Sequence, residues 1–140
     1  MRHAIFSVAL AVFLAGCANT HKGRAVQLVM ASDAVADEIA QSWEAGVDAQ
    51  IQHCKATLGE GEQVTSEQKE DCMGIFGKGE PLEAATQALV TVQVSIQEAV
   101  KCEQLKTCPQ KVDWKSLKAT ALDAWTALRP YYEAIAKKGN

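Results

Sequence analysis

Apolar side chains recur at intervals of three and four residues along three long stretches of this chain, which is the spacing of one face of an α-helix. The first stretch runs from about residue 25 to residue 58, and Gly59 follows it as a stop signal. The second runs from about residue 81 to 106 and the third from about residue 113 to 138. This pattern predicts an all-α fold, a three-helix antiparallel bundle.

The second stretch has the most regular apolar face. Residues 90–96 also alternate apolar and polar side chains as a strand does. Strong helix formers flank this segment and no partner strand is evident elsewhere, so a helix is predicted, with Pro81 at its first position. Its apolar positions alternate steps of three and four residues, a heptad pattern: Leu82, Ala85, Leu89, Val92, Ile96 and Ala99.

The first and third stretches carry less regular stripes. Asp113 is a suitable N-cap for the third helix. Pro130 lacks a backbone N–H and clashes one turn back, so a kink or break is expected near residues 126–129. The first stripe consists of Val29, Ala36, Ile39, Trp43, Val47, Ile51 (or Gln50), Cys54 and Leu58. The third consists of Trp114, Leu117, Ala121, Leu128, Tyr132 (or Tyr131) and Ile135, widened by Leu122 and Trp125.

The sequence that connects the first two helices has the pattern of a short extra helix. Thr65 and Gln68 have the spacing of a capping box, and Gly77 would end the helix after residues 66–76. Ile75 and Phe76 would then plug one end of the bundle.

The first 17 residues have the pattern of an export signal. A positive start, Met1-Arg2-His3, precedes an apolar core at residues 4–13 and the tetrapeptide Leu14-Ala15-Gly16-Cys17. A positive start, a short apolar core and small residues near a cut site define a secretory signal. The apolar core is shorter than the 20 or so residues that a membrane-spanning helix needs, which argues against an uncleaved anchor.

The tetrapeptide at residues 14–17 resembles the lipobox of bacterial lipoproteins, a resemblance confined to the first 17 residues. It implies that residues 1–16 are removed and that Cys17 carries a diacylglyceryl thioether, with an acylated amine in many bacteria. Residues 17–24 would be a lipidated tether, and residues 25–140 the helical domain. Ala18, where enteric-type lipoproteins retained in the inner membrane have Asp, favours the outer membrane facing the periplasm. A plain secretory signal with a chance cysteine is the alternative.

The other four cysteines form an even set, which in an exported chain indicates two disulfides. In an antiparallel layout Cys54 and Cys102 lie at opposite ends of a hairpin, roughly 30 Å apart by helical rise. A disulfide needs Cα atoms within about 7 Å, so the geometry predicts Cys54–Cys72 and Cys102–Cys108.

The charge pattern argues against nucleic acid and anionic lipid as partners. The 140 residues carry a formal net charge of −3 and have no basic run. Five lysines, at positions 101, 106, 111, 115 and 118, are interpreted as a solvated helix face.

Catalytic and cofactor motifs are not recognisable. His53 adjoins Cys54, but no Cys-x-x-Cys spacing for zinc or redox chemistry exists and no Cys-x-x-Cys-His for attached haem. Met30, Met73 and His53 are better interpreted as core and surface than as haem ligands. No Gly-x-Ser-x-Gly turn or phosphate-binding glycine loop is present. We therefore expect neither metal nor cofactor, and no enzyme.

The leading hypothesis is an envelope lipoprotein whose helical domain serves protein–protein interaction or an envelope structural role. The alternative is a small-ligand or cofactor carrier with a cavity between the helices, opened by the kink at Pro130. Aromatic side chains often dominate partner surfaces. Candidates for partner binding are Trp43, Trp114, Trp125, Tyr131 and Tyr132.

Overall fold

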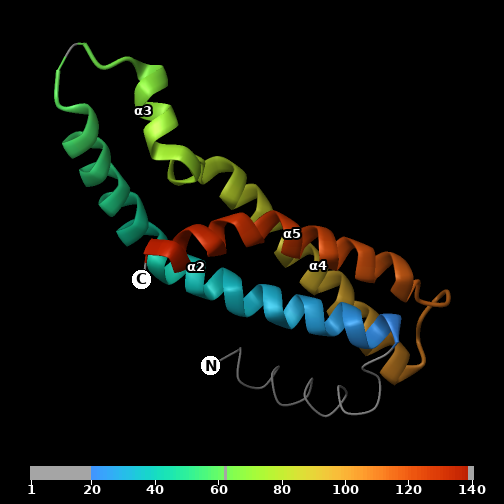
Figure 1. Ribbon diagram of the computed structural model, residues 1–140. Helices are drawn as coiled ribbons and strands as arrows, with labels where there is room; N and C mark the ends of the chain where they lie inside the picture. Colours follow the sequence, from blue (N-terminus) through green and yellow to red (C-terminus); the bar gives the residue numbers. More distant parts are fainter. Residues whose placement is uncertain (1–19, 62, 139–140) are drawn as a thin grey trace.

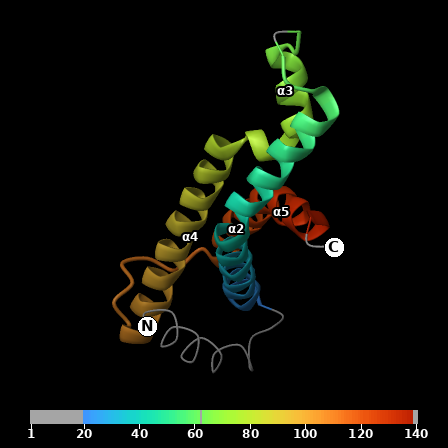
Figure 2. The ribbon, with the colours of Figure 1, turned by 90° about the vertical axis from the view of Figure 1, so that its left-hand side faces the viewer.

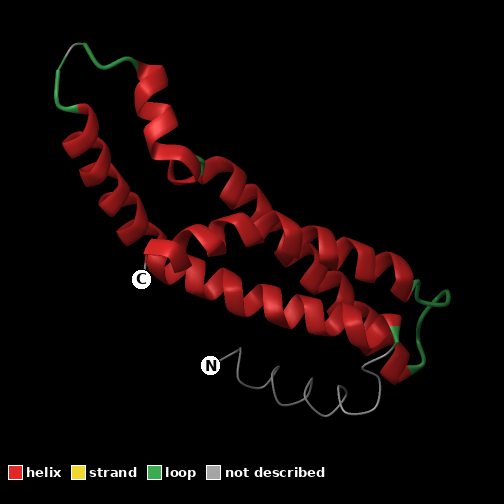
Figure 3. Ribbon diagram, in the orientation of Figure 1, coloured by secondary structure: helices red, strands yellow, loops and turns green. Residues whose placement is uncertain are grey.

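The computed structural model describes residues 20–61 and 63–138, and every regular element in these ranges is helical (Figure 3). The elements in chain order are α2 (His21–Leu58), α3 (Ser66–Met73), the short 3-10 helix η1 (Gly74–Gly77), α4 (Gly79–Leu105) and α5 (Trp114–Lys138). The all-α prediction of three long helices with a short helix in the first connection is confirmed.

The three long helices pack side by side, and a bent arm extends from one end of the bundle. Figure 1 shows α2 and α4 running in opposite directions, with α5 returning alongside α2. Figures 1 and 2 both show the C-terminal part of α2 leaving the bundle together with α3. We call residues 47–73 the arm. Beyond Gly46, the buried residues of α2 and α3 reduce to Cys54, so the arm adds little to the core.

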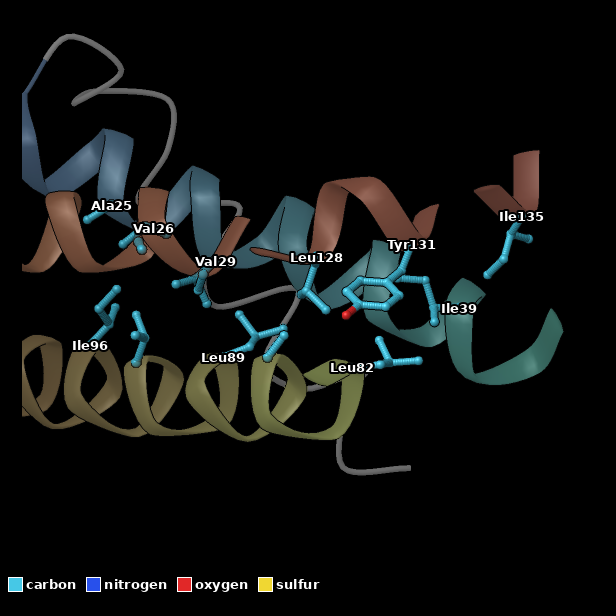
Figure 4. Close-up of a cluster of buried hydrophobic side chains, with 14 residues drawn as sticks. Ala25, Val26, Val29, Ile39, Leu82, Leu89, Ile96, Leu128, Tyr131 and Ile135 are labelled. Atoms are coloured by element: carbon cyan, nitrogen blue, oxygen red, sulfur yellow. The ribbon is translucent and has the colours of Figure 1, made fainter. Parts of the chain in front are cut away.

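The core lies between α2, α4 and α5, whose buried side chains form one cluster. In Figure 4, Ile96 of α4 lies opposite Val26 of α2, and Leu89 lies opposite Leu128 of α5. Leu82 lies opposite Ile39 of α2 and Tyr131 of α5. All six positions of the predicted heptad face of α4 are buried. A strand would place Val90 and Val94 on the same face as Val92 and Ile96. In the structure Val90 and Val94 are instead 43% and 47% exposed. The helical interpretation of this segment is therefore confirmed.

The N-terminus of α2 differs from the prediction. The helix begins at His21 rather than near residue 25, because the Thr20 hydroxyl accepts a hydrogen bond from the Gly23 backbone N–H at 3.0 Å and caps it. Gly23, Ala25 and Val26 are buried against the bundle. Residues 21–24 thus belong to the helix, and assigning them to a tether was wrong. The signal peptide and Cys17 lie outside the described residues.

The connection from α2 to α4 follows the expected pattern with small shifts. Thr65 and Gln68 form the predicted capping box. The α-helix ends at Met73 and continues as η1 to Gly77. α4 then begins at Gly79, so Pro81 is its third residue rather than its first, a position in the first turn where the missing N–H costs nothing.

The last helix runs without a break through Pro130. The Asp113 carboxylate accepts from the Ser116 backbone N–H at 3.1 Å, which confirms the N-cap. Of the expected kink or break, the structure therefore has no break, and Leu128, Tyr131 and Ile135 are buried on both sides of the proline. Figure 1 shows its axis bending in the C-terminal half. Tyr131, not Tyr132, occupies the buried face.

Candidate functional site

Two disulfides brace opposite ends of the molecule. Cys54 pairs with Cys72 at a Cα–Cα distance of 5.9 Å, and Cys102 pairs with Cys108 at 4.8 Å. This is the pairing predicted from the sequence. The first disulfide ties α3 to α2 within the arm, and the second closes the turn between α4 and α5. The Gln50 side-chain amide adds a second link in the arm by donating to the Cys72 carbonyl at 2.6 Å.

Phe76 connects the arm to the bundle, as the sequence predicted for an end plug. Its ring lies 5.1 Å from the Trp43 ring, centroid to centroid, and Trp43 meets Tyr131 edge-on at 5.7 Å. Gly46 allows this approach, because a Cβ there would fall 2.6 Å from Phe76 Cε1. The requirement for glycine at position 46 depends on a tertiary contact and could not be derived from the helical pattern.

A charged cluster closes the other end of the bundle. The Lys22 ammonium donates to Glu103 Oε1 at 2.7 Å, and the Trp114 indole donates to Glu103 Oε2 at 3.0 Å. Lys22 also lies 5.4 Å from the centre of the Trp114 ring. Partial burial raises the pKa of the Glu103 carboxyl, but hydrogen bonds from Lys22 and Trp114 and the positive charge of Lys22 outweigh it. The pKa of Glu103 is therefore lower than usual.

This lowered pKa makes stability depend on pH. The charged carboxylate stabilises the fold at pH values above its unfolded pKa, and the contribution is lost as the pH falls through the lower folded pKa. We expect Glu103→Gln to reduce the loss of stability between neutral and strongly acidic pH, measured by urea unfolding. Glu98→Gln, at an exposed position of the same helix, is the control. Identical pH dependence in both variants would contradict the assignment.

The five aromatic candidates differ in what surrounds them. Tyr131 is 6% exposed and belongs to the core. Trp43, Trp114 and Tyr132 are half-buried and pack against the core cluster. Trp125 is half-buried but stands outside both the cluster and the side chains packed against it. Of the predicted partner-binding residues, Trp125 is therefore the one whose position the core does not explain.

Trp125 belongs to a stripe along the outer side of α5. Lys118, Leu122, Trp125 and Arg129 follow each other at steps of four, three and four residues, so they share one face of the helix. Leu122 is 48% exposed. Arg129 donates to Glu133 at 2.8 Å, which holds its guanidinium along the helix. We call these four residues the α5 face: an apolar centre with a cationic side chain at each end.

Surface hollows occur at the turn closed by Cys102 and Cys108, in the arm, and where the arm end of the bundle meets η1. The arm contains one of about 280 Å³, floored by Ile51, Leu58, Val64 and Met73, with Lys55 and Lys69 beside it. A second, of about 400 Å³, lies where η1 meets α5 and is lined in part by Phe76 and Pro130. Both open to solvent at the edge of the bundle rather than between its three helices.

Within the described ranges, no group of three or more His, Cys, Asp or Glu side chains could hold a metal ion. His21 and His53 are both exposed, and the four described cysteines are all disulfide-bonded. Nor does any helix of residues 20–61 and 63–138 have the length and apolar character to cross a membrane.

Comparison with known proteins gives no match: no protein-family model, no curated protein and no solved structure is similar to this chain. Its function must therefore be inferred from its own residues and their geometry.

Proposed function

We propose that the chain is a bacterial envelope lipoprotein, anchored by lipid on Cys17, whose helical domain binds another envelope protein through the α5 face. The lipobox at residues 14–17 supports the anchor, and the outer membrane facing the periplasm is the proposed location. The observation that supports the binding role is the pairing of exposed Leu122 with Trp125 one turn away, outside the core.

The α5 face has the chemistry of a protein-binding surface. Tryptophan and arginine are enriched among residues that contribute most to binding energy, and they act best where the partner excludes water around them. Lys118 and Arg129 flank the apolar pair, so the complementary partner has an apolar groove with carboxylates at its rim. Because Leu122 and Trp125 contribute little to the core, this surface is available without unfolding any element.

A carrier of a small apolar ligand is the second candidate, supported by the hollow in the arm. Its volume of about 280 Å³ lies at the lower limit of ligand pockets, which usually exceed 300 Å³. A ligand retained by the purified protein in native mass spectrometry would favour this candidate over protein binding.

Site-specific crosslinking in intact cells tests the binding role. A photoreactive amino acid replaces Trp125 in one variant and Val94 in another; Val94 is 47% exposed on α4 and serves as a matched position. We expect one adduct of defined mass from position 125 and none from position 94. Adding Leu122→Gln to the first variant should remove most of that adduct. Equal adducts from both positions, or none from either, would contradict the proposal.

A further inference from the structure

Cationic side chains gather at the end of the bundle where α2 begins. The first turns of α2, the end of α4, the following turn and the start of α5 all meet there (Figure 1). We call residues 20–31 and 98–118 the basic end. They contain seven Lys and Arg against three Asp and Glu, a local excess of four positive charges. Because these residues are far apart in the sequence, no basic run reveals them.

The opposite end is acidic. The arm, residues 47–73, holds six Asp and Glu against two lysines. The formal net charge of −3 therefore conceals a strongly polarised molecule. A charge balance calculated for the whole chain does not describe what either end would attract.

Three carboxylates lie at the basic end, and one of them, Glu98, is exposed on α4. Glu103 is paired with Lys22, and the Asp113 carboxylate caps α5. Five cations remain exposed at this end: Arg24, Lys101, Lys106, Lys111 and Lys115.

An exposed leucine lies among these cations. Leu105 is 61% exposed in the last turn of α4, directly before Lys106. Apolar and basic side chains together are the combination that binds at the interface of an anionic bilayer, where the apolar group enters and the cations meet the headgroups.

The position of the anchor identifies the surface that the basic end faces. Thr20, the N-cap of α2, follows Cys17 by three residues. Three residues span at most about 11 Å, and the Debye length is about 8 Å at physiological salt and about 10 Å at 0.1 M. A lipid on Cys17 would therefore hold the basic end within electrostatic range of phospholipid headgroups, with the arm at the far end.

We propose that the basic end docks on an anionic phospholipid surface and holds the acidic arm away from the membrane. This orientation rests on the proposed lipid anchor, although the affinity of the basic end for headgroups does not require it. Docking would present α5 side-on to a partner in the same compartment, because α5 begins at the membrane and runs outward. This proposal differs from the expectation that these lysines form a solvated face and that anionic lipid is not a partner, because it weighs the charge of one end instead of the whole chain.

Vesicle sedimentation with residues 18–140, which contain the whole described core and both disulfides, tests the proposal independently of lipidation. One vesicle type is phosphatidylcholine alone and the other contains about one third phosphatidylglycerol. We expect binding only to the second, weakening as salt is added. Lys106→Gln, Lys111→Gln and Lys115→Gln together should lower the partition coefficient about a hundredfold.

The matched control neutralises three lysines elsewhere, with the same change in net charge. Lys55→Gln, Lys69→Gln and Lys78→Gln lie in or beside the arm and should leave vesicle binding unchanged, with circular dichroism confirming that both variants fold. Equal loss in both triple variants, or equal binding of the parent to both vesicle types, would overturn the proposal.

Tighter binding to duplex DNA than to anionic vesicles at the same salt would overturn it in favour of nucleic acid. Because Cys17 is absent from this chain, none of these outcomes depends on lipidation.

Discussion

Leu128→Ala is expected to lower the free energy of unfolding by about 3 kcal/mol. Leu128 is 0% exposed and lies between α2 and α4, where Figure 4 shows it pointing toward Leu89. Truncation removes buried methyl groups and leaves a cavity that three packed helices cannot close fully. Since single domains are stable by only about 5 to 15 kcal/mol, this is a large fraction of the total.

The same helix supplies the control for this measurement. Leu122→Ala makes an identical chemical change at a position that is 48% exposed, and surface changes of this kind usually stay within about 0.5 kcal/mol. Urea unfolding followed by circular dichroism compares the two variants. Similar losses in both would show that α5 does not bury the face described.

Removal of the arm disulfide by Cys54→Ala with Cys72→Ala has a second large expected effect. The bond closes a loop with a sequence separation of 18, which corresponds to about 3 kcal/mol in the chain-entropy model. Loss of the bond should also loosen α3 locally, because α3 has no buried residue that would anchor it to the core. Without the bond, α3 is held against α2 by the Gln50 hydrogen bond and by partly buried side chains such as Met73.

Hydrogen exchange separates the local effect from the global one. We expect amides of α3 to lose protection in the double variant, while those of α4 keep theirs under conditions where the bundle stays folded. The control removes Cys102 and Cys108, whose separation is only 6, which corresponds to about 2 kcal/mol. That change should leave α3 protected. Loss of α3 protection in the control would contradict the assignment of the arm to the first disulfide alone.

The spacing of apolar residues was sufficient to predict the buried face of a helix that packs along its whole length. The face of α4 follows from alternating steps of three and four residues, and all six predicted positions are buried. The disulfide pairing likewise follows from an antiparallel layout and the reach of a disulfide bond. In both cases a local rule and the global fold require the same arrangement.

The features missed from sequence depend on contacts between distant segments. Thr20 and Gly23 are polar or small, so nothing apolar marked the true start of α2. The close approach of Phe76 to Gly46 depends on how the arm folds back. The basic end is formed from short segments brought together by three helix ends, which a linear scan for charge runs cannot detect.

For the same reason, the sequence alone could not identify which aromatic residues are available to bind a partner. The wide apolar stripe of the third helix favoured its aromatic residues over Trp43, but only their packing separated Trp125 from the rest. A tryptophan one turn from a leucine on an amphipathic helix has the same spacing whether it is buried or exposed.

The mass of the N-terminal peptide of the mature protein, purified from membranes, tests the central claim most directly. The lipoprotein proposal predicts a peptide that begins at Cys17, lacks residues 1–16 and carries a diacylglyceryl group, with or without a further acyl chain on its amine. Cys17→Ser should abolish that modification and release the protein from the membrane fraction. A mature chain that begins at another residue, or that keeps Cys17 as a free thiol or in a disulfide, would contradict the proposal.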